Sequence, residues 1–143
     1  MEKIQSPAAF DDQIEVGSFS EIQQYHQQAE VYLAQGLTYT ARQTLAQAYT
    51  LLTQATKNTK LTPDQPHFGT LTLTLARTYQ QEQRYPEADA FFRDALNHLL
   101  VEGLALALGH AYFAYGEALK ERGNYQLACH YLSLAYLTHR DLG

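Results

Sequence analysis

The sequence predicts an all-α fold made of three antiparallel helix hairpins. Its four prolines, at positions 7, 63, 66 and 86, and the glycines at predicted turns separate long blocks that can be helical. No block alternates apolar and polar residues over a length that would indicate a β-strand. Within each block, small and large apolar residues recur three and four positions apart, which is the spacing of residues on one face of a helix.

The first hairpin is predicted to begin at a capping box. Ser18 is followed three residues later by Glu21, a pattern in which both side chains satisfy free backbone amides at a helix start. We therefore expect one helix over about 19–35 and a second over about 39–57, with a turn at Gly36 between them.

The second hairpin follows a predicted loop at 58–69, where two prolines, an aspartate and a glycine interrupt the helical pattern. A helix is expected over about 70–81. The next helix starts within the stretch RYPEADAFFRDAL, residues 84–96. Pro86 then lies in its first turn, where a backbone N–H would have no intrahelical partner.

The third hairpin is expected to contain one helix that ends near residue 122 and another that ends near residue 139. Gly123 supplies permissive backbone for the turn between them, and Asn124 is the predicted N-terminal cap of the last helix. The predicted domain organisation is an N-terminal extension at 1–17 and a helical repeat domain at 18–143, with repeats at about 22–57, 69–101 and 109–141.

Small and large residues recur in the same order in all three hairpins, with successive separations of 4, 3, 4, 5, 4 and 3 residues. Two antiparallel helices that cross closely need small residues at the crossing and large residues around it. Gly36 and Gly123 take the turn position, whereas the middle copy has Gln83 and is expected to have an irregular turn. The three series are Tyr25, Ala29, Tyr32, Gly36, Ala41, Leu45 and Ala48; Thr72, Ala76, Tyr79, Gln83, Ala88, Phe92 and Ala95; and Tyr112, Gly116, Leu119, Gly123, Ala128, Leu132 and Ala135.

The series resembles the tetratricopeptide repeat, whose signature is an aromatic, a small residue and a tyrosine, then Ala, a bulky residue and Ala. Thr72 and Leu119 depart from this signature, and the copies start at 25, 72 and 112 rather than about 34 residues apart. The longer spacing is similar to the kinesin-light-chain type of repeat, with His67 in the place of its loop histidine. The resemblance implies an α–α superhelix, or solenoid, of three hairpins.

The resemblance also implies a non-catalytic scaffold or adaptor that binds a peptide or helix of a partner protein in a concave groove. His26, Glu30 and Leu73 stand where some family members clamp a C-terminal carboxylate with lysines and asparagines, so no such clamp is expected. The alternative is that the groove residues are only solvated helix faces. The predicted groove residues are His26, Glu30, Leu33, Leu73, Arg77, Gln80, Gln81, His110, Phe113, Glu117, Lys120 and Glu121.

The last helix is predicted to carry an apolar outer face, unlike the second helices of the first two hairpins. An uncovered apolar stripe commonly marks an interface, so we expect it to form a homodimer or to bind a partner. The alternative is that the N-terminal segment or the end of the chain covers it. The predicted interface residues are Leu127, Tyr131, Leu134 and Leu137, with Phe91 as a further outward-pointing aromatic.

Composition argues against several other functions. Fifteen acidic and ten basic residues give a net charge of -5 without a basic stripe, so nucleic acid is not expected as a partner. No two histidines have the four-residue spacing of metal ligands on one helical face, and no cofactor or nucleophile motif occurs, so no metal, cofactor or enzymatic activity is expected. The single cysteine, Cys129, is expected to be a small core residue. A reducing cytoplasm and no membrane association are expected.

Overall fold

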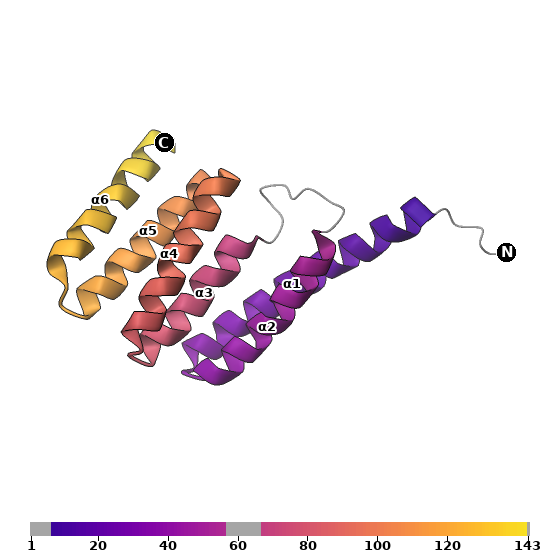
Figure 1. Cartoon of the computed structure of the whole chain (residues 1–143), viewed down its shortest axis with the longest axis horizontal. Helices are drawn as coiled ribbons and strands as arrows, with labels where there is room; N and C mark the ends of the chain where they lie inside the picture. Colours follow the sequence, from indigo (N-terminus) through magenta and orange to yellow (C-terminus); the bar gives the residue numbers. More distant parts are fainter. Residues whose placement is uncertain (1–6, 57–66, 143) are drawn as a thin grey trace. The chain divides into compact units, whose positions relative to one another are not determined.

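The computed structural model describes residues 7–56 and 67–142, with 7–18 described as backbone only. It confirms the all-α class, since the described residues form six helices and no strand (Figure 1). The helices are α1 Pro7–Ala34, α2 Thr38–Ala55, α3 Phe68–Gln81, α4 Tyr85–Glu102, α5 Ala105–Glu121 and α6 Tyr125–Leu142.

The chain divides into two compact units, Met1–His67 and Phe68–Gly143. In the first unit, α1 packs against α2. In the second unit, α3 packs against α4 and α5 against α6, while α5 also contacts α4 and α3. The three predicted helix pairs are therefore present, and the second unit joins two of them into one packed body.

The predicted helix start near residue 19 is wrong, because α1 begins at Pro7 and Ser18 lies within it. No proline follows Pro7 in this segment, and extending an existing helix by one residue is far easier than starting a new one. Phe19 and Ile22 are buried, so α1 is already packed at the position where the capping box predicted the helix to start. The Ser-x-x-Glu pattern occurs here inside a helix.

The other helix boundaries lie close to those predicted. The structure begins α3 at Phe68, so the last two residues of the predicted loop 58–69 are helical, and 57–66 lie outside the described residues. Pro86 occupies the first turn of α4 as predicted. The backbone N–H of Leu127 donates to Asn124 Oδ1 at 3.4 Å, which confirms Asn124 as the cap of α6.

The turns within the three hairpins have the same backbone, which corrects the prediction that the middle one is irregular. Gly36, Gln83 and Gly123 all have positive φ, at 81°, 62° and 85°. In each turn, the backbone N–H of the residue after the one with positive φ donates a hydrogen bond to the carbonyl five residues earlier. The bond from Arg84 to the Tyr79 carbonyl, at 2.9 Å, is an example. This is the Schellman motif, and Gln83 adopts the left-handed conformation that glycine adopts in the other two hairpins.

The small positions of the repeat series are buried in every hairpin, as predicted. They are Ala29, Ala41 and Ala48; Ala76, Ala88 and Ala95; and Gly116, Ala128 and Ala135. At Gly116 the helices approach closely, since a Cβ there would lie 2.7 Å from the Leu132 side chain. The opposite ends of the second and third hairpins show a further approach that the repeat series had not included. A Cβ at Gly69 would meet Leu99, and one at Gly109 would meet His139, each at 2.6 Å.

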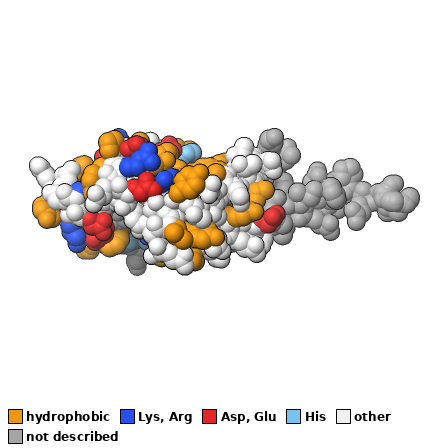
Figure 2. Space-filling view, turned by 90° about the horizontal axis from the view of Figure 1, so that it is seen from below, with side chains coloured by type: hydrophobic (Ala, Val, Ile, Leu, Met, Phe, Trp, Pro, Cys, Tyr) orange, Lys and Arg blue, Asp and Glu red, His pale blue; other side chains and the backbone are white. Residues whose placement is uncertain are grey.

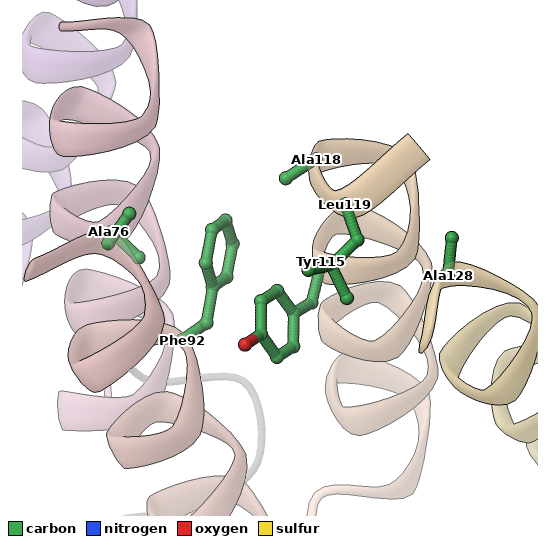
Figure 3. Packing of buried hydrophobic residues seen from close by; sticks show 7 residues of the cluster. Ala76, Phe92, Tyr115, Ala118, Leu119 and Ala128 are labelled. Carbon is green, nitrogen blue, oxygen red and sulfur yellow. The ribbon is translucent and has the colours of Figure 1, made fainter. Parts of the chain in front are cut away.

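Aromatic stacking joins the two hairpins of the second unit. The ring of Phe92 on α4 faces that of Tyr115 on α5, with centroids 4.6 Å apart (Figure 3). Ala76, Ala88 and Leu119 surround the pair, and both aromatic side chains are almost completely buried. Because offset aromatic pairs add about 0.5–1.5 kcal/mol beyond burial, this contact helps to fix α5 on α4.

Candidate binding surfaces

A polar cluster ties α3, α4 and α5 together and determines how their outer faces are presented. Asp89 on α4 accepts a hydrogen bond from the Tyr115 hydroxyl at 2.8 Å and forms an ion pair with Arg122 at 2.8 Å. Arg122 Nε donates to Gln80 Oε1 at 3.0 Å, and its guanidinium lies 4.5 Å from the centre of the Tyr85 ring. We call these five residues the Asp89 cluster.

The Asp89 cluster changes the protonation behaviour of Tyr115. Burial, together with the hydrogen bond to Asp89, raises the pKa of the Tyr115 hydroxyl well above its ordinary value. The hydroxyl therefore stays protonated and remains a donor at any physiological pH. Sequence analysis had singled out only Gln80 of the cluster, because its members come from α3, α4, α5 and the turn after α5 and share no local pattern.

The exposed face of α5 carries a row of residues spaced four and three apart. It runs from apolar Leu106 through His110 and Phe113 to Glu117 and Lys120, and Phe113 is 50% exposed. Lys120 Nζ lies 3.3 Å from Glu117 Oε1, so the charged end of the row is internally paired. The row thus presents apolar and imidazole groups at one end and a neutralised ion pair at the other.

The predicted groove residues of α3 are only partly available on the surface. Arg77 and Gln81 are exposed, while Leu73 is half-buried against the core of the second unit. Gln80 donates to the Ala118 carbonyl at 3.0 Å and lies 3.5 Å from Glu121 Oε1 on the neighbouring helix. The structure therefore brings Gln80 and Glu121 together, and α3 and α5 present one adjoining surface.

The predicted groove residues of α1 belong to the first unit. His26 is half-buried and lies 3.9 Å from Glu30, one helical turn away and exposed. Leu33 is only 4% exposed, so it belongs to the core of its hairpin and not to an outer face.

Two of the predicted interface residues are packed inside the second unit. Phe91 stacks on Tyr79 with centroids 5.3 Å apart, and Tyr131 lies 4.6 Å from the Tyr115 ring. Both occupy the same repeat position, three residues after one buried alanine and four before the next, which turns them toward the partner helix. Their assignment to an outward face was wrong, and this spacing was the signal that could have shown it.

The remaining predicted interface residues lie at the surface of α6. Leu127 and Leu137 are exposed and Leu134 is half-buried. Cys129 is also exposed, which corrects the expectation that it is a core residue. It follows Ala128 directly, and one residue turns a helix by about 100°, so a buried neighbour does not bury it.

Comparison of the chain with models of protein families, with curated proteins and with solved structures finds no match.

Among the described residues, no helix combines the length and apolar character needed to cross a membrane. The same residues contain no group of three His, Cys, Asp or Glu side chains placed to hold a metal ion. On the face seen in Figure 2, blue and red side chains lie next to one another in mixed groups.

Proposed function

We propose that this protein is a non-catalytic interaction module of the tetratricopeptide type, which binds a peptide or helix of a partner protein on the surface formed by α3 and α5. Three helix pairs with the same turn, and buried small residues at every repeat crossing, support this family type. The proposed activity is recognition by a preformed surface.

The observation that carries the proposal is the bond from Gln80 on α3 to the Ala118 carbonyl on α5. It holds the two helices at a fixed spacing, so Arg77 and Phe113 project from a rigid support. Rigid presentation reduces the entropy lost on binding and thereby favours affinity. The ligand best suited to this surface has an apolar side chain for Phe113 and a carboxylate for Arg77.

Selection from a library of displayed random peptides, with the full chain as bait, tests this function. Enriched peptides should combine an aromatic or aliphatic residue with an acidic one. In fluorescence anisotropy, Arg77→Glu and Phe113→Ala should each weaken binding about tenfold. Arg140→Glu and Leu100→Ala are matched controls at exposed positions on α6 and α4, and they should leave affinity unchanged.

Two results would contradict the proposal. One is a library selection that yields no peptide with measurable affinity. The other is an enriched peptide whose binding is unaffected by both Arg77→Glu and Phe113→Ala, because the α3 and α5 surface would then take no part in recognition.

A further inference from the structure

One flank of α6 exposes residues that correspond to a covered flank of α4. The flank consists of Tyr125, Cys129, Leu132 and Tyr136, spaced four, three and four apart, and we call it the α6 face. Tyr125 and Tyr136 are each 66% exposed, Cys129 is exposed and Leu132 is half-buried. Within the described residues, α5 is the helix against which α6 packs, and it reaches the edge of this flank at Leu132, whose side chain lies close to Gly116.

The repeat places each of these residues against a counterpart on α4. Since Ala88, Phe92 and Ala95 correspond to Ala128, Leu132 and Ala135, the α4 counterparts of the α6 face are Tyr85, Asp89, Phe92 and Leu96. All four contribute to the junction with the next hairpin. Tyr85 and Asp89 meet Arg122, Phe92 stacks on Tyr115, and Leu96 packs against the same core. Within the described part of the second unit, the α6 face is therefore an inter-hairpin surface over which no further helix lies.

The chemistry of the α6 face excludes a covering helix like α5. At the junction of α4 with the next hairpin, Arg122 forms an ion pair with Asp89 and the Tyr115 hydroxyl donates a hydrogen bond to it. A helix like α5 would place the same two groups against the α6 face. Cys129 stands at the Asp89 position and carries no charge, so an arginine there would be left without a carboxylate. From 124 to 139 the chain contains no Asp, Glu, Lys or Arg. The matching occupant must be uncharged and apolar.

A second α6 face meets this requirement, because an uncharged face can lie on itself without like-charge repulsion. The spacing of its residues, four, three and four, is also the same in both directions. Tyr125 and Tyr136 are equally far from the midpoint between residues 130 and 131, and so are Cys129 and Leu132. Antiparallel packing about that midpoint sets each Tyr125 against the partner's Tyr136 and each Cys129 against the partner's Leu132.

We propose that two copies of this chain associate with two-fold symmetry through the α6 face, with the two α6 helices antiparallel and centred between residues 130 and 131. Helix axes in such contacts lie about 8–10 Å apart. The two Cys129 residues are then offset along the axes by about 4.5 Å, at a rise of about 1.5 Å per residue. The association uses a surface distinct from that of α3 and α5 and does not depend on the proposed peptide binding.

Sedimentation equilibrium of the full chain, combined with cross-linking by a short bis-maleimide, tests the proposal. The chain has one cysteine, so a covalent dimer can form only through Cys129 of both copies. Wild-type protein should sediment as a dimer at micromolar concentration and cross-link efficiently. Tyr136→Glu should raise the dimer dissociation constant about 100-fold and abolish cross-linking, because symmetry places each substitution in the interface twice.

Tyr39→Glu is the matched control, since Tyr39 is also 66% exposed but lies on α2. It should sediment and cross-link like wild type. Helical content from circular dichroism should be equal in all variants, because the substituted tyrosines are exposed. The double variant Tyr125→Arg with Tyr136→Glu should regain most of the dimer lost in Tyr136→Glu alone, because antiparallel packing pairs the introduced charges.

Three outcomes would overturn the proposal. The first is a wild-type monomer at concentrations of hundreds of micromolar. The second is a dimer that survives Tyr136→Glu and does not cross-link at Cys129, which would place the interface elsewhere. The third is a double variant no more dimeric than Tyr136→Glu, which would exclude the antiparallel register.

Discussion

Tyr115 on α5 donates a 2.8 Å hydrogen bond to Asp89 on α4, although the two residues are 26 positions apart in the chain. The same carboxylate forms the ion pair with Arg122, whose side chain is only 10% exposed. One carboxylate thus takes part in both a hydrogen bond and an ion pair at the junction of two hairpins. The stability of the second unit should depend on it.

Asp89→Ala is expected to lower the free energy of unfolding by about 2–3 kcal/mol, because it leaves the Arg122 guanidinium without its carboxylate and Tyr115 without its acceptor. Urea denaturation followed by circular dichroism measures the change. Asp94→Ala on the same helix is the control, since the pair that Asp94 forms with His98 at 3.8 Å is exposed, and its effect should stay within about 0.5 kcal/mol. Equal losses in both variants would contradict the role given to Asp89.

Stability should fall at alkaline pH because of Tyr115. Its pKa is raised in the folded chain above the ordinary value of 10.0, by burial and by the hydrogen bond to Asp89. Below pH 10 both states hold the proton and the full stability is present. Above it the unfolded state loses the proton first, so the free energy of unfolding declines with pH. Tyr115→Phe should make the decline between about pH 10 and 11 shallower than in wild type. If the free energy of unfolding fell equally steeply with pH in both proteins, Tyr115 would not be the source of the decline.

Gln83→Gly should stabilise the chain by about 1 kcal/mol, because Gln83 has a φ of 62°, a conformation that costs a residue with a Cβ about 1–2 kcal/mol. Thermal unfolding measures the gain. Gln81→Gly, two residues earlier in the last turn of α3, should instead destabilise by about 0.5–1 kcal/mol. A loss of stability in Gln83→Gly would show that the left-handed turn is absent in solution.

Gly116→Ala should destabilise the third hairpin by about 1–3 kcal/mol, since the new Cβ would lie 2.7 Å from Leu132. Removing the obstructing side chain should relieve the overlap. The double variant Gly116→Ala with Leu132→Ala is therefore expected to lose less stability than the sum of the two single variants, as measured by urea denaturation. Strict additivity would show that the two residues are not in contact.

Local spacing was sufficient to predict much of the fold. The small residues of the series, the position of Pro86 and the cap at Asn124 all depend on neighbours within one or two helical turns. The start of α1 was missed because Ser-x-x-Glu is compatible both with a helix start and with a helix interior. The turn at Gln83 was expected to be irregular because Gln83 is not a glycine. Its backbone nevertheless adopts the same positive φ as Gly36 and Gly123.

The binding surfaces were harder to predict than the helices. Sequence analysis found the exposed residues Arg77, Phe113 and Lys120, because these positions follow from helical period. It placed Phe91 and Tyr131 outward, although each packs on an aromatic of the adjacent helix. Which flank of a helix is covered depends on the side from which the next helix approaches, and a period of 3.6 residues does not carry that information.

By itself, therefore, the sequence determined the helical class, the pairing of neighbouring helices and the small residues at their crossings, because these follow from interactions that are local or that lie within one hairpin. Only the tertiary structure decided that Asp89 contacts both Tyr115 and Arg122, that Arg122 reaches Gln80 from 42 residues away, and that Tyr125 and Cys129 on the α6 face are exposed among the described residues. These features depend on how whole helices are rotated and spaced against one another, and many residues distant in the chain set that geometry together.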